Sequence, residues 1–114
     1  MSNTALNGRW RMEQSFSPTF YININNNVIT VEQPGCAFSG TASLEGSLVG
    51  QPVALGIANF SQEDCGAPPT SITTYLGTVE TVGGDVPTVL SGSATGGGLH
   101  QPNPDFGTWT ATRV

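Results

Sequence analysis

The chain contains no lysine, and its arginines are only three: Arg9, Arg11 and Arg113. Charged residues make up 10% of the sequence, against roughly a quarter in an ordinary domain. The formal net charge is −5, so the surface has little with which to neutralise phosphate groups. Neither nucleic acid nor an anionic membrane surface is therefore an expected partner.

Long apolar runs and metal-ligand clusters are also missing. No stretch approaches the roughly 20 apolar residues that a transmembrane helix needs, so membrane insertion is not expected. The start MSNTALNG lacks the basic region and the apolar stretch of a signal peptide. One histidine and two distant cysteines do not form a metal motif, and no cofactor is expected.

Cysteine is nearly absent too, and its even count is informative. Cys36 and Cys65 both lie in turn-like surroundings, in QPGCAF and EDCGAPP. We expect a disulfide that links two loops, with two free thiols as the alternative. A disulfide implies an oxidising compartment, so the expected location is extracellular or periplasmic, with any signal peptide removed.

What the sequence does contain is turn formers and polar strand residues. It has 15 glycines and 8 prolines, and Ser, Thr, Asn and Gln provide most of its polarity. This composition favours short strands and tight turns over helices. A length of 114 residues predicts one domain, residues 1–114, with a single core.

Apolar residues recur with a period of two almost throughout the chain. In GRWRMEQ, Trp10 and Met12 alternate with Arg9 and Arg11. The segments TFYINI and VITVEQ alternate in the same way and flank the run Asn25–Asn27. Asparagine tolerates left-handed backbone, so this run predicts a hairpin turn.

The remainder of the chain continues the pattern of strands and turns. In the segment after Pro34 and Gly35, Phe38, Gly40 and Ala42 share one face. Two stretches without a period, residues 60–70 and 96–105, are expected to be long loops. Eight or nine strands result, which predicts an all-β antiparallel eight-stranded up-and-down barrel, with a β-sandwich as the alternative. A closed barrel also removes the exposed edges of a chain that has few charges.

The position of Arg113 supports closure of the barrel. Alternation places Trp109 and Arg113 on one face of the last strand, and that face is expected to be inward. A buried guanidinium is costly unless it stacks on an aromatic ring and donates to backbone carbonyls. Because first and last strands pair in a closed barrel, Trp10 is the expected ring.

Gly8-Arg9-Trp10 resembles the Gly-x-Trp opening of the calycins, the group of lipocalins, fatty-acid-binding proteins and avidins. WTATRV is similar to a stretch near the end of avidins, and FSGTAS is similar to one of their middle strands. The resemblance implies a barrel in which Arg113 packs over Trp10. The avidin biotin site is not reproduced, because Met12 stands near its Asn position and Ala42 where a Tyr is expected.

The inward aromatic and apolar residues are the candidate ligand site. An apolar interior suits a small hydrophobic ligand, and the same residues would also fill a packed core. The candidate ligand-binding residues are Trp10, Met12, Phe20, Phe38, Tyr75 and Trp109, and the candidate structural residues are Arg113, Cys36 and Cys65.

The alternative function is recognition of a protein or a glycan by the long loops. Tyr21, Phe60 and Tyr75 are expected to be exposed aromatics, as in a protease inhibitor or a lectin-like module. Enzymatic activity is not expected, because His100 near Asp105 is the one candidate catalytic pair and no nucleophile accompanies it.

Overall fold

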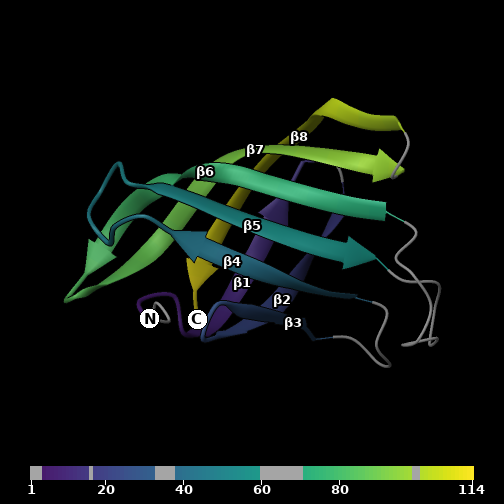
Figure 1. Cartoon of the computed structure of the whole chain (residues 1–114). Helices are drawn as coiled ribbons and strands as arrows, with labels where there is room; N and C mark the ends of the chain where they lie inside the picture. The colour runs from purple at the N-terminus through teal and green to yellow at the C-terminus, as the bar shows by residue number, and fades with distance from the viewer. Residues whose placement is uncertain (1–3, 16, 33–37, 60–70, 99–100) are drawn as a thin grey trace.

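The computed structural model describes residues 4–15, 17–32, 38–59, 71–98 and 101–114. Its described residues form eight antiparallel strands and no helix. Each strand pairs with the next one along the chain, and the ring closes into a barrel (Figure 1). The strands are β1 (Gly8–Gln14), β2 (Ser17–Asn25), β3 (Val28–Val31), β4 (Phe38–Leu44), β5 (Pro52–Asn59), β6 (Ser71–Gly83), β7 (Val86–Gly98) and β8 (Gln101–Arg113).

The ring is closed by antiparallel pairing of β1 with β8. Trp10 lies opposite Arg113, and Gln14 lies opposite Trp109. The backbone N–H of Val114 donates to the Arg9 carbonyl at 2.9 Å, which extends this ladder by one residue. The predicted up-and-down barrel is therefore confirmed, and the β-sandwich alternative is wrong.

We call the end of the barrel at which β1 begins and β8 ends the base (Figure 1). The turn between β2 and β3 lies there, with Asn26 at φ 50° and Asn27 at φ 69°. Both values are left-handed, as a two-residue hairpin turn requires. The Asn26 N–H donates to Oδ1 of Asn7 at 2.9 Å, which ties this turn to the N-terminal segment. The predicted asparagine hairpin is confirmed.

Strands β6 and β7 approach each other closely at a pair of glycines. Gly77 lies opposite Gly92, and a Cβ on Gly77 would stand 1.9 Å from the Ser91 carbonyl oxygen. A Cβ on Gly92 would stand 2.0 Å from the Leu76 carbonyl oxygen. Since no side chain fits at such distances, the inner surface of the barrel is bare backbone at this point.

The inward residues form one apolar core. Polar and charged residues occupy the alternate, outward positions, in agreement with the predicted alternation of β1, β2 and β3. The side chains that are less than 2% exposed include both aromatic and aliphatic residues: Leu6, Trp10, Met12, Ile22, Ile29, Leu55, Val79 and Leu90.

The expectation of a long loop over residues 96–105 is wrong. Strand β7 continues to Gly98 and β8 begins at Gln101, with Gly96 opposite Asn103 and Gly97 opposite Pro102. Glycine and proline are both compatible with extended backbone, and a proline removes only one donor from a ladder. The hairpin therefore continues through a segment whose composition favours loops.

Candidate functional site

The base is sealed by the side chain of Arg113. Its Cζ lies 4.4 Å from the centroid of the Trp10 ring, a cation–π contact. Its Nε donates to the Pro87 carbonyl at 2.9 Å, and its two terminal nitrogens donate to the carbonyls of Asn7 and Ala5. The predicted stacking of Arg113 on Trp10, with donors feeding backbone carbonyls, is confirmed.

The first residue of the Gly8-Arg9-Trp10 motif has a clear role in this seal. Gly8 adopts φ 138°, and a Cβ there would stand 2.6 Å from a terminal nitrogen of Arg113. Because glycine has no Cβ, it allows both this backbone conformation and the close approach of the guanidinium. Burial lowers the pKa of Arg113, although a guanidinium remains charged at any ordinary pH.

Two of the candidate ligand residues belong to the base. Trp10 and Met12 are 0% exposed, and the indole N–H of Trp10 donates to the Leu6 carbonyl at 2.9 Å. Leu6, which sequence reasoning missed, is also 0% exposed and comes from the segment that precedes β1. These side chains are packed core, so a ligand would have to bind elsewhere in the barrel.

The far half of the interior, which we define by Tyr75 and Trp109, is built differently. The two rings meet edge to face, with centroids 5.7 Å apart and an interplanar angle of 77°. The Trp109 indole N–H donates to the carbonyls of Ser93 at 3.0 Å and Leu76 at 3.3 Å. The indole thus reaches two strands beyond its own, across the inner surface that the glycines leave bare.

A polar pair accompanies these rings. The phenol of Tyr75 donates to Oε1 of Gln14 at 2.8 Å, and the Gln14 amide donates to the Pro18 carbonyl at 3.3 Å. Burial raises the pKa of Tyr75, so its hydroxyl is neutral at ordinary pH. Thr73 is the one buried polar residue among those described, and it lies two residues before Tyr75 on the same face. The far half therefore combines aromatic surface with neutral hydrogen-bonding groups.

Small residues lie opposite and beside Tyr75. Ala94 pairs directly with Tyr75 on one side and with Gly107 on the other. Gly96 follows on the same face of β7 and is buried. On its other side Tyr75 pairs with Leu55 of β5, a large residue that is 1% exposed. The small described residues beside Tyr75 therefore belong to β7 and β8, whereas β5 contributes a large aliphatic side chain.

The expectation that Tyr75 is an exposed aromatic is wrong, because its side chain is 3% exposed. Its strand carries apolar residues on both faces, with Ile72 and Leu76 outward, so alternation alone does not tell which face is inside. Gln14 was missed as a site residue, although its inward phase follows from Trp10 and Met12.

Other predicted residues are placed only in part. Phe20 is half-buried and packs against the core, and Phe38 pairs with Asn59 at the start of β4, its side chain lying outside the described part. Cys36, Cys65, Phe60 and His100 lie outside the described residues. The disulfide and the recognition role of loop 60–70 therefore stay predictions.

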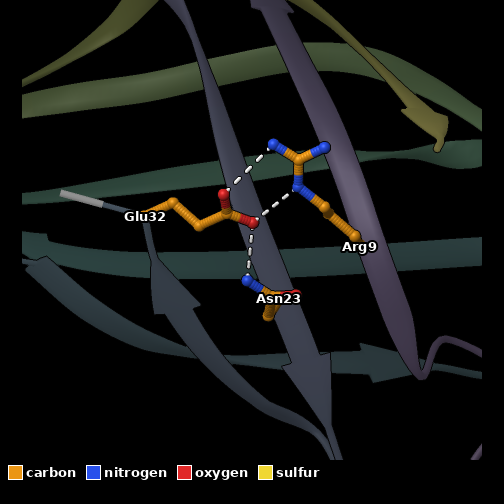
Figure 2. Close-up of polar contacts among 3 residues, drawn as sticks. All are labelled: Arg9, Asn23 and Glu32. Carbon is orange, nitrogen blue, oxygen red and sulfur yellow. Dashed lines mark hydrogen bonds and ion pairs between the residues drawn. The ribbon is translucent and has the colours of Figure 1, made fainter.

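A charged cluster lies on the outer wall of the barrel (Figure 2). Arg9 forms an ion pair with Glu32 at 2.8 Å, and the Asn23 amide donates to the same carboxylate at 2.7 Å. The hydrogen bond between Arg9 and Glu32 raises the pKa of Arg9 and lowers the pKa of Glu32. The Cζ of Arg9 also lies 4.1 Å from the Tyr21 ring centroid. This cluster is neutralised internally and faces solvent.

A shallow depression of about 260 Å³ lies on the wall formed by β4, β5 and β6. Leu76, which borders it, is 51% exposed and points away from the interior. The depression is smaller than a typical small-molecule site of roughly 300–1,000 Å³. Its lining residues are Ser43, Glu45, Pro52, Val53, Ala54, Leu76 and Gly77.

In the part of the chain that the structure describes, no three or more His, Cys, Asp or Glu residues group together in a way that suits a metal ion. None of the described segments forms a helix of the length and apolarity needed to cross a membrane.

The described residues thus define an eight-stranded up-and-down β-barrel with an arginine-capped base. No protein-family model matches the chain, and no curated protein or solved structure matches it significantly.

Proposed function

We propose that this protein is a calycin-like, non-enzymatic barrel that binds a small hydrophobic molecule in the far half of its interior. The observation that carries the proposal is the contrast along the barrel axis. Large aliphatic and aromatic side chains fill most of the base, whereas Tyr75 has Ala94 and then Gly107 on its β7 side and Leu55 on its β5 side. On this proposal the ligand packs against Tyr75 on the side where the described side chains are small.

The chemistry of the far half suits binding better than catalysis. Apart from Arg113, the described inward residues carry no side chain that is charged at neutral pH. Tyr75 has its pKa raised by burial, which makes it a poor general base. An apolar wall with a few neutral polar groups is typical of a binding site for small molecules.

The base supports the proposal by making the barrel rigid. Arg113 joins β8 to the N-terminal segment and to Pro87 through three carbonyls. A binding site gains affinity when its walls are ordered before the ligand arrives. The arginine–tryptophan contact is also the feature in which the calycin resemblance is most specific.

The test is a fluorescence titration with the neutral probe N-phenyl-1-naphthylamine, with binding read from tryptophan quenching and from probe emission. The variant Ala94→Leu fills the space beside Tyr75 and should weaken binding at least tenfold. The matched control, Ser93→Leu, adds the same side chain to the adjacent outward position and should leave binding unchanged.

Thermal unfolding of both variants separates binding from stability. If the far half has room for a ligand, Ala94→Leu should unfold near the wild-type temperature. A variant destabilised by about 1–3 kcal/mol, with no probe binding to the wild type, would show a packed interior and end the proposal.

A further inference from the structure

We propose that the ligand of this barrel is uncharged and that the far half selects neutral molecules over their carboxylate analogues. This inference rests on the proposed function, since it specifies the class of molecule that the same site takes. The preferred class is an apolar molecule that carries one hydroxyl or carbonyl group. The argument begins from the small number of cations in the chain.

Every arginine of the chain is already engaged outside the far half. The sequence has three arginines and no lysine, and all three arginines are described. Arg9 is paired with Glu32 at 2.8 Å and Arg11 with Glu13 at 3.1 Å, both on outward positions of β1. Neither can turn inward without reversing the alternation of its strand.

Arg113 faces inward, but it lies at the base and its side chain is already bound within the chain. Its nitrogens donate to the carbonyls of three residues, and its plane covers Trp10. Trp109 lies four residues away on the same strand, about 14 Å at the rise of an extended chain. Met12, Ala111 and Leu90 are paired side by side between the two and are each 0% exposed.

A carboxylate in the far half would therefore be buried without a cationic partner. Such a group either stays in water or takes up a proton, because an unpaired charge in an apolar site is strongly disfavoured. The net charge of −5 adds a long-range repulsion of anions. Neutral groups face no such penalty, and the polar residues of the far half, Tyr75, Gln14 and Thr73, are themselves uncharged.

The test compares ligands that differ in one charge. Retinol is titrated against retinoate, and N-phenyl-1-naphthylamine against its sulfonated analogue 8-anilino-1-naphthalenesulfonate, all at pH 8 with the full chain. The neutral member of each pair should bind at least tenfold more tightly. Equal affinity within both pairs would overturn the inference while leaving the proposed function intact, whereas no binding by any of the four probes would overturn the proposed function.

His100 is the one other side chain of the sequence that becomes cationic near neutral pH, so it provides a control. Retinoate is titrated at pH 5.5 against wild type and His100→Gln. Tighter binding at pH 5.5 in both proteins would reflect protonation of the ligand itself, as the inference requires. Tighter binding that is lost in His100→Gln would show a cationic contact and contradict the inference.

A gain of function completes the test. Gln14→Arg places a guanidinium beside Tyr75 at a position that is half-buried, so the charge remains partly solvated. In this variant the preference for retinol over retinoate should shrink at least tenfold or reverse. An unchanged preference in a folded variant would show that charge in the far half does not control selection.

Discussion

The two tryptophans of this barrel are equally buried and yet do different things. Trp10 is 0% exposed and lies under a cation whose donors are bound to three backbone carbonyls. Trp109 is 2% exposed and lies against a neutral phenol, with its own N–H shared between two carbonyls of the sheet. At the base, the Arg113 guanidinium and the Trp10 indole N–H already donate to backbone carbonyls of the chain. In the far half the polar groups are neutral, and this is the half in which we propose that a ligand binds.

The largest expected effect comes from removing the charge at the base. Arg113→Met keeps an apolar chain over Trp10 but loses the three hydrogen bonds to the carbonyls. Charged hydrogen bonds contribute about 1.5–3 kcal/mol each and are not additive, so we expect a loss of about 3 kcal/mol in the free energy of unfolding. Urea denaturation followed by tryptophan fluorescence measures it.

The matched control is Arg9→Met, which removes an arginine from the same end of the barrel but from its outer wall. Exposed ion pairs contribute little, so this variant should unfold close to wild type. If the two variants lose the same free energy of unfolding, Arg113 stabilises the fold no more than an exposed arginine does. The contrast between the two halves would then be wrong.

A smaller effect is expected at the glycine pair that supports Trp109. Gly92→Ala would place a Cβ 2.0 Å from the Leu76 carbonyl oxygen, which forces the strands apart. We expect a loss of about 2 kcal/mol, together with a shift in tryptophan emission as the bonds of the Trp109 indole are disturbed. Equilibrium unfolding and the emission spectrum of the native state measure the two effects.

Gly56→Ala provides the comparison for this variant, because a Cβ at Gly56 would meet nothing within 4 Å. Both glycines lie inside strands, so the change in chain entropy is the same for both. Gly56→Ala should be neutral or slightly stabilising. A similar loss in both variants would mean that the close approach of β6 and β7 does not matter.

The smallest effect concerns the outer wall and depends on pH. The hydrogen bond from Arg9 holds the pKa of Glu32 below its ordinary value, so the ionised form stabilises the folded state. This contribution is present above the pKa of the unfolded chain and is lost as the pH falls through the lower folded value. Glu32→Gln should therefore lower the Tm slightly at pH 7, and this difference should shrink as the pH is lowered into the acid range. A Tm difference that persists unchanged at pH 3 would contradict this assignment.

Sequence reasoning succeeded where local rules determine the structure. Asparagine tolerates left-handed backbone, so the turn at Asn26 and Asn27 followed from residue type alone. The contact of Arg113 with Trp10 followed from alternation and from the rule that first and last strands meet in a barrel. The first prediction needed only the backbone preference of asparagine, and the second needed only the period of the strands and the cost of a buried charge.

It failed where the outcome depends on packing between distant strands. Tyr75 lies on a strand with apolar residues on both faces, and its burial depends on Ala94 and on Leu55, its partners in the neighbouring strands. The hairpin through Gly96 and Pro102 continues because the partner strand is present, although either segment alone favours a loop. Leu6 is buried only because the barrel has a base to be filled.

Closure of the ring has a consequence for how this protein folds. The contact between Trp10 and Arg113 joins residues that are about a hundred positions apart, so it belongs to the slowest class of pairings. Until β1 meets β8, an intermediate would present two unpaired strand edges to other chains, and such edges tend to aggregate. Refolding yield should thus fall with protein concentration, and it should fall most in variants that delay this last pairing.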